Sequence, residues 1–128
     1  MTGDATASAL DLEAGPLLRP VLARVVSAFA ARADLTVDRV LDARLLGEAL
    51  AAHAPRHLRD GRLAMAIEST PRRLVLRLGP LDNGSGARLL ADSVIPEVGP
   101  ILERLANSVR VQEEGGSDYL VMELTAGP

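Results

Sequence analysis

Hydrophobic residues recur along the chain first at the spacing of helices and later at the spacing of strands. Residues 10–12 alternate leucine with an acidic residue and predict a short edge strand. Over residues 17–33, apolar positions lie three or four apart with arginines outside the stripe, which predicts a first helix. A second helix is predicted to run up to Pro55. Its expected buried stripe consists of Val37, Val40, Leu41, Leu45 and Ala52.

The spacing falls to two beyond residue 61, and it predicts a hairpin with one buried face. The residues expected to point inward are Leu63, Met65, Ile67, Leu74, Leu76 and Leu78. Gly79-Pro80 is predicted to end this hairpin, and the glycine-rich segment 82–86 indicates a flexible loop before a short helical stretch over 87–92. A third helix from Pro100 and a last hairpin over 109–124 complete the series.

This order of elements predicts the fold class. Strand, two helices, two strands, one or two helices and two strands are typical of an α/β chain of the α+β two-layer sandwich type. We expect a mixed, mostly antiparallel sheet with its helices on one face. The 128 residues fit one domain, for which we expect a flexible N-terminus over 1–9 and a single domain over 10–125.

The composition excludes several classes of chemistry. The chain has no cysteine, and its 14 basic residues are all arginine. It therefore has no disulfide, no zinc-thiolate site and no thiol nucleophile, and it has no lysine for a P-loop or a Schiff base. A formal net charge of −3 and two aromatic residues argue against direct nucleic-acid binding.

The chain shows no pattern of a targeting or membrane segment. Residues 1–9 lack the basic start and the apolar middle of a signal peptide. Arginines interrupt the apolar stretches well short of the roughly 20 residues that a spanning helix needs. We therefore expect a soluble, cytoplasmic protein without a membrane partner.

Glu48 is the most informative single residue. Helical spacing places it within the expected apolar stripe of the second helix, near Leu41 and Leu45. A carboxylate there is costly unless it meets a partner or lines a cavity, so Glu48 is a candidate catalytic residue. The alternative is that Glu48 reaches water at the edge of the stripe or pairs with Arg44, four residues earlier.

Asp82, Gly84 and Gly86 form an Asp-x-Gly-x-Gly segment after a predicted strand. The glycines would let the backbone come close to a nucleotide, and Asp82 would accept a hydrogen bond from a base amino group. The same residues also make an ordinary turn.

His53 and His57 are four residues apart, a spacing that brings two imidazoles to one helix face. Pro55 lies between them and indicates that the helix has ended. No metal site is predicted here.

Taken in order, these segments resemble a known family. Residues 17–29 and 38–54, the latter reading DRVLDARLLGEALAAHA, resemble the first two helices of the anti-sigma-factor serine kinases of the GHKL (histidine-kinase-like, Bergerat-fold) ATPase superfamily. The following hairpin, the glycine-rich loop and the segments 99–111 and 115–124 resemble the rest of that domain in the same order. The resemblance covers the chain from about residue 10 to residue 124 and implies a Bergerat-like fold.

The resemblance implies a role for Glu48 and a departure at Ala52. Glu48 matches the glutamate that in the family activates or orients water or the hydroxyl of the protein substrate. Ala52 stands where the family has the asparagine that holds magnesium on the phosphates of ATP. Magnesium needs oxygen ligands and alanine has none to offer.

Other residues match the cofactor-binding positions of the family, and each motif is altered. They are Asp82, Gly84, Gly86, Gly99 and Ser117. The Asp-x-Gly-x-Gly segment comes a few residues later than in the family. Gly99 matches one glycine of the phosphate-lid motif, and Glu97 stands in place of the partner glycine two residues earlier. An acidic side chain facing the phosphates would repel the nucleotide.

The resemblance and its departures lead to three functional hypotheses. The leading one is a regulatory anti-sigma-factor-like domain that binds a protein partner, a sigma factor or an anti-anti-sigma protein, with weak or lost binding of ATP and magnesium. The second is an active serine/threonine kinase that acts on an anti-anti-sigma protein. The third is a structural or dimerisation domain without such a partner. A homodimer is expected from the resemblance alone.

Overall fold

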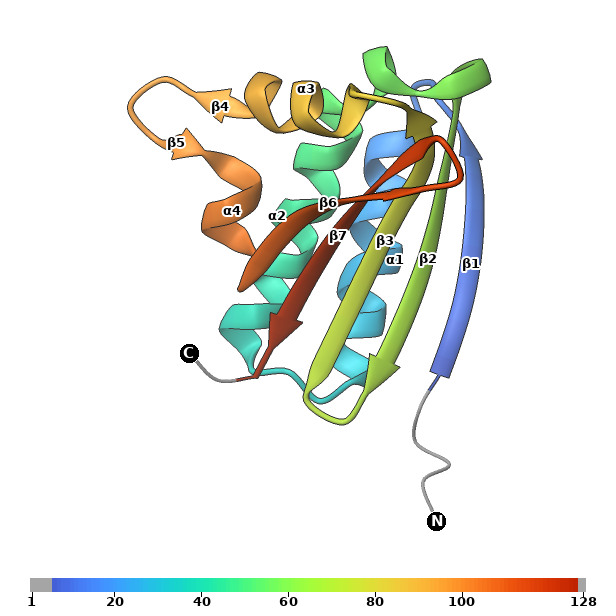
Figure 1. Ribbon diagram of the computed structural model, residues 1–128. Coiled ribbons are helices and arrows are strands. Elements are labelled where there is room, and N and C mark those ends of the chain that lie inside the picture. Colours follow the sequence, from blue (N-terminus) through green and yellow to red (C-terminus); the bar gives the residue numbers. More distant parts are fainter. Residues whose placement is uncertain (1–5, 127–128) are drawn as a thin grey trace.

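The computed structural model describes residues 6–126, which form a five-stranded sheet with helices on one of its faces (Figure 1). The strands are β1 (Thr6–Glu13), β2 (Arg62–Thr70), β3 (Arg73–Asp82), β6 (Ser108–Glu114) and β7 (Ser117–Thr125). They lie in the order β1-β2-β3-β7-β6, and each neighbouring pair runs antiparallel. The predicted α+β two-layer sandwich is confirmed.

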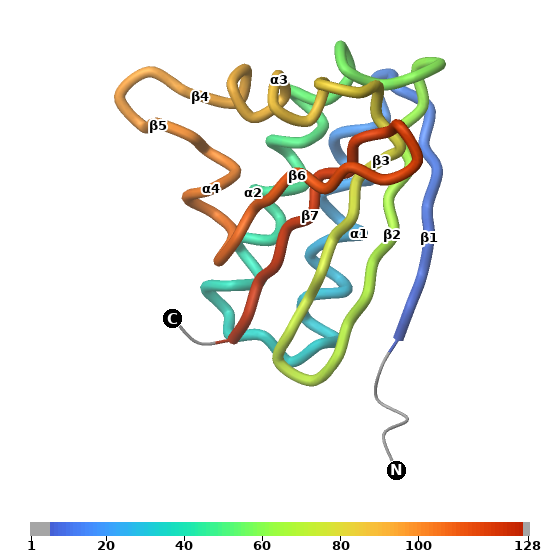
Figure 2. The backbone as a smooth tube through the Cα atoms, in the orientation of Figure 1, coloured from blue at the N-terminus to red at the C-terminus, as the bar shows by residue number. Residues whose placement is uncertain are grey.

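The helical layer begins with α1 (Leu18–Arg32) and α2 (Val37–His53), which pack side by side against the sheet. The short turns η1 (Pro55–His57) and η2 (Arg59–Gly61) then lead into β2. Figure 2 shows that α3 (Ser85–Asp92), the small hairpin of β4 (Val94–Ile95) and β5 (Gly99–Pro100), and α4 (Ile101–Leu105) continue this layer beyond α2. None of the helices within residues 6–126 is long and apolar enough to cross a membrane.

The core lies between the sheet and the helices, and the alternation of the strands builds it. All six residues that the pattern placed on the inner face of β2 and β3 are buried. Leu120, Met122 and Leu124 of β7 continue this layer across the sheet, since they pair with Leu78, Leu76 and Leu74. Because every second residue of a strand faces the same side, the charged residues of β2 and of residues 73–78 in β3 lie on the opposite side of the sheet. They are Arg62, Glu68, Arg73 and Arg77.

Two predicted strand boundaries are wrong. β1 begins at Thr6, so residues 6–9 pair with β2 and are not a flexible segment; residues 1–5 lie outside the described part of the chain. The small side chains at 6–9 carry no alternation signal, and backbone pairing decides the strand. β3 does not end at Gly79-Pro80, because Leu81 resumes pairing with β7 after a register shift and is fully buried.

The predicted buried stripe of α2 is also wrong. Val37 is 85% exposed, and Leu41, Leu45 and Ala52 are exposed as well, whereas Val40 is partly buried against the core. The buried residues of this helix are Ala43, Leu46, Gly47, Leu50 and Ala51. Three of them are small and lie four residues apart, so they let α1 approach closely, and the larger residues on the other side of α2 remain at the surface.

Gly47 marks the closest approach of the two helices and yields a stability prediction. An added Cβ at this position would lie 3.0 Å from the Cα of Ala23 and 3.0 Å from the carbonyl oxygen of Leu22, both backbone atoms of α1. In an isolated helix, alanine is more favourable than glycine by about 1 kcal/mol. Here we expect Gly47→Ala to lower the free energy of unfolding by about 1–3 kcal/mol in urea titrations, because the helices must move apart.

Gly15→Ala is the matched control for this experiment. An added Cβ at Gly15 has nothing within 4 Å, so we expect its free energy of unfolding to stay within about 0.5 kcal/mol of the parent. A stabilised Gly47→Ala variant would contradict the close packing of α1 on α2.

Candidate functional site

The polar end of β3 and β7 brings together four of the residues predicted to bind a cofactor. Asp82 and Ser117 are direct partners across these two strands. Gly84 and Gly86 follow Asp82 at the start of α3, beside the turn that joins β6 to β7 (Figure 1). We name this cluster the sheet-end site.

Asp118, which the sequence analysis did not single out, lies at the centre of the sheet-end site. Its Oδ2 accepts hydrogen bonds from the backbone N–H of Gly84 at 2.9 Å and of Gly86 at 3.0 Å. Asp118 is only 5% exposed. Both amides are thus occupied by a carboxylate of the protein itself.

The N-terminus of α3 explains why a carboxylate lies at this position. The first N–H groups of a helix have no acceptor within the helix, and the partial positive charge there favours an anion. Gly84, at the N-cap, has a φ of 90° and no side chain that could accept these bonds. Asp118 of β7 therefore caps α3 from another element. Because side chains alternate along β7, Asp118 lies on the same face as the buried Leu120. This alternation could have predicted from the sequence that Asp118 is buried.

Gly86 is required for the close approach of α3 to the β6–β7 hairpin. A Cβ on Gly86 would lie 2.7 Å from Cγ1 of Val111 and 3.2 Å from Oδ2 of Asp118. The absence of a side chain thus serves internal packing. In this structure the glycine is explained without a bound nucleotide.

Arg59 closes the sheet-end site from the side of η2. Its Nε donates to Oδ1 of Asp82 at 3.0 Å, and its terminal nitrogen donates to the hydroxyl of Ser117 at 3.2 Å. Asn83, between Asp82 and Gly84, donates to the carboxylate of Glu113 in β6. Arg59 therefore engages Asp82, which was expected to accept from a base amino group, and Ser117, another predicted cofactor-binding residue.

His57 fixes the other end of α3. Its Nε2 lies 2.6 Å from Oδ2 of Asp92, the last residue of that helix. The imidazole is almost fully buried, whereas Asp92 is exposed. His57 therefore links η1 to α3, and with Asp118 it holds the helix at both ends.

Gly99 does not join the sheet-end site. It lies in β5, where it pairs with Ile95, and its φ of 98° is the left-handed conformation that favours glycine. The eight residues of α3 separate the two places, and a helix of that length spans about 12 Å. Figure 2 shows the β4–β5 hairpin at the far end of α3.

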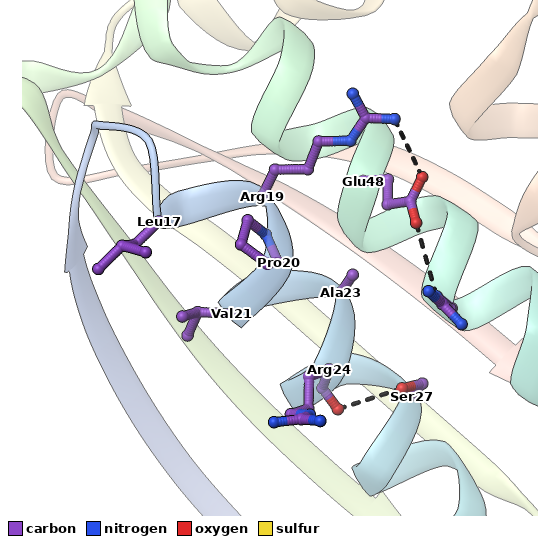
Figure 3. Close-up of a pocket in the computed structure, with 9 residues that line it drawn as sticks. Leu17, Arg19, Pro20, Val21, Ala23, Arg24, Ser27 and Glu48 are labelled. Atoms are coloured by element: carbon purple, nitrogen blue, oxygen red, sulfur yellow. Dashed lines mark hydrogen bonds and ion pairs between the residues drawn. The ribbon is translucent and has the colours of Figure 1, made fainter.

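Glu48 lies in a different place again, on the side of α2 that faces α1 (Figure 3). Its carboxylate oxygens lie 3.2 Å from a terminal nitrogen of Arg19 and 3.5 Å from Nε of Arg44. Arg39, nine residues earlier on α2, bonds the carbonyl of Leu105 in α4. Nine residues are two and a half helical turns, so Glu48 faces away from α4.

The pairing of Glu48 with Arg44 is the alternative that the sequence left open, and it is confirmed. The expected buried stripe around Glu48 is wrong, because Leu41 and Leu45 are exposed. Glu48 does line a cavity, which it shares with residues of α1. Glu48 therefore lies on the opposite side of α2 from α4. Its carboxylate is paired with two arginines.

Comparison of the chain with protein-family models finds no match, and a search of curated proteins also finds no significant match.

Asp118 yields a stability prediction, because the buried amide of Gly86 and the half-buried amide of Gly84 depend on its carboxylate. We expect Asp118→Ala to lower the free energy of unfolding by about 2–4 kcal/mol. Each hydrogen bond to a charged group contributes about 1.5–3 kcal/mol, and water replaces part of the bond to the half-buried Gly84 amide. Asp118→Asn keeps an acceptor without the charge, so its free energy of unfolding should lie between those of the parent and of Asp118→Ala. Urea titrations measure all three proteins.

Asp82→Ala is the control, because Asp82 lies at the same end of the sheet but is exposed and paired with a half-exposed arginine. We expect its loss to stay below about 1 kcal/mol. Equal losses in Asp118→Ala and Asp82→Ala would mean that Asp118 does not hold the first turn of α3.

Proposed function

We propose that the protein is a regulatory, anti-sigma-factor-like domain that binds a protein partner and has weak or lost ATP binding. The partner class is a sigma factor or an anti-anti-sigma protein, and we propose a cytoplasmic homodimer. The observation that carries the loss of ATP binding is the contact of Asp118 with the amides of Gly84 and Gly86. A buried carboxylate there repels an incoming anion and occupies the two donors.

The order of the elements supports the family part of the proposal. The resemblance implies a strand, a helical hairpin, a strand hairpin, a glycine-rich loop, further helices and a final hairpin. The chain has these elements in this order, packed as two layers.

The donor set does not fit ATP with magnesium. The carboxylate of Asp82 is bonded to Arg59, and that of Glu48 is bonded to two arginines. Ala52 offers no oxygen to a magnesium ion. We therefore derive no phosphoryl-transfer step at the sheet-end site.

Calorimetric titration with ATP and magnesium tests the proposal. We expect no saturable binding up to about 1 mM ATP, the concentration that corresponds to roughly 4 kcal/mol of binding free energy. Micromolar binding together with phosphorylation of a serine on an added anti-anti-sigma protein would refute it.

The second hypothesis, an active serine kinase, has one observation in its favour. Asp82, Gly84, Gly86 and Ser117 do lie together at one end of the sheet. In that case Glu48 acts as the general base and Asp82 binds adenine.

A substitution at Glu48 separates the two hypotheses. A kinase that uses Glu48 as its base should lose phosphotransfer by a factor of about 10²–10⁴ in Glu48→Ala. The exposed Glu103 of α4 provides the control variant, Glu103→Ala, which should keep the parent rate. Our proposal predicts no phosphotransfer in the parent protein, in radiolabel assays with the candidate substrate. A parent rate that Glu48→Ala leaves unchanged would reject the catalytic role.

A further inference from the structure

A groove lies between α1 and α2 (Figure 3), and none of the residues of the sheet-end site lines it. Its volume is about 630 Å³. The large apolar side chains of its lining are Leu17, Pro20 and Val21 at the start of α1, and Ala23 adds to them. Three arginines, Ser27 and the carboxylate of Glu48 form the rest of the wall.

Exposed apolar side chains lie in the groove itself. Of the eight large hydrophobic residues that are exposed within residues 6–126, Leu17 and Val21 line it. Leu17 is 72% exposed and Val21 is 36% exposed. Large apolar side chains that remain open to solvent in a hollow are typical of an interaction site.

The charge of the groove is opposite in sign to the charge of the whole chain. Arg19, Arg24 and Arg44 line it together with one carboxylate, that of Glu48, whereas the chain has a net charge of −3. Arg19 and Arg44, the two partners of Glu48, are 67% and 63% exposed. Two positive charges therefore remain on the rim after Glu48 is neutralised.

We infer that this groove binds an acidic amphipathic helix of the partner protein, and the inference rests on the proposed protein-binding function. The apolar face of such a helix would cover Leu17, Pro20 and Val21. Its acidic side chains would pair with Arg19 and Arg24 at the rim. Amphipathic helices dock in apolar grooves in this way, and opposite charges speed the encounter and orient the helix.

Two other occupants fit less well. A membrane surface is flat, whereas these side chains line a hollow between two helices. A second copy would need an acidic segment, and two acidic residues of its β6–β7 hairpin, Glu113 and Glu114, already contact Asn83 and Arg77. An acidic helix of another protein satisfies both the shape and the charge.

The probe for the test is a synthetic amphipathic helix of about 18 residues, five helical turns, with leucine on one face and glutamate on the other. A matched peptide carries glutamine in place of every glutamate. Fluorescence anisotropy with the labelled peptides measures affinity, and amide chemical-shift mapping on the full chain locates the contact. We expect the glutamate peptide to bind at least tenfold more tightly than the glutamine peptide and to shift amides of α1 and α2.

Charge reversal at the rim tests the residues directly. We expect the double variant Arg19→Glu with Arg24→Glu to bind the glutamate peptide at least tenfold more weakly. Arg110→Glu reverses an exposed charge on β6 and should change the affinity less than twofold. Thermal melting shows whether each variant is folded, and the shift map on the parent protein locates the contact without any variant.

Four results would overturn the inference. They are no binding of the glutamate peptide, equal affinity for the rim variant, shifted amides confined to another surface, and binding to phosphatidylserine vesicles in place of the peptide. Each leaves the ATP titration untouched, so the docking surface and the proposed loss of ATP binding fail separately.

Discussion

The carboxylate of Asp118 joins the end of β7 to the first turn of α3. One buried oxygen accepts from two backbone amides that have no acceptor within the helix. The packing of α3 on the sheet depends on that contact, because it holds Gly86 against Val111 of β6. With His57 holding Asp92 at the other end, α3 is fixed to both the sheet and η1.

The sheet-end site and the α1–α2 groove differ in how far their polar and apolar groups are already satisfied within the chain. At the sheet-end site, the polar groups are satisfied within the chain, by Asp118 and by Arg59. At the α1–α2 groove, apolar side chains and the cations of Arg19 and Arg24 face solvent. Internal hydrogen bonds must be broken before a ligand enters the first region, whereas a partner at the second buries surface that is already open.

The fold could be predicted from the sequence because the alternation on β2, β3 and β7 leaves only one face of each strand that can be buried. The face of α2 could not, since that helix carries apolar residues on two sides and only its packing on α1 through Gly47 decides between them. The pairing of Glu48 with Arg44 was within reach of helical spacing. Arg59 was not, because it reaches partners 23 and 58 residues away along the chain.

Amide hydrogen exchange at Gly84 and Gly86, followed by NMR, tests the central claim most directly. Neither amide has an acceptor within α3, so protection of both must come from Asp118. We predict exchange at least about a hundredfold slower than in an unstructured chain, unchanged when ATP and magnesium are added. Exchange at the unstructured rate in the free protein, with protection that develops only on adding ATP, would contradict the account.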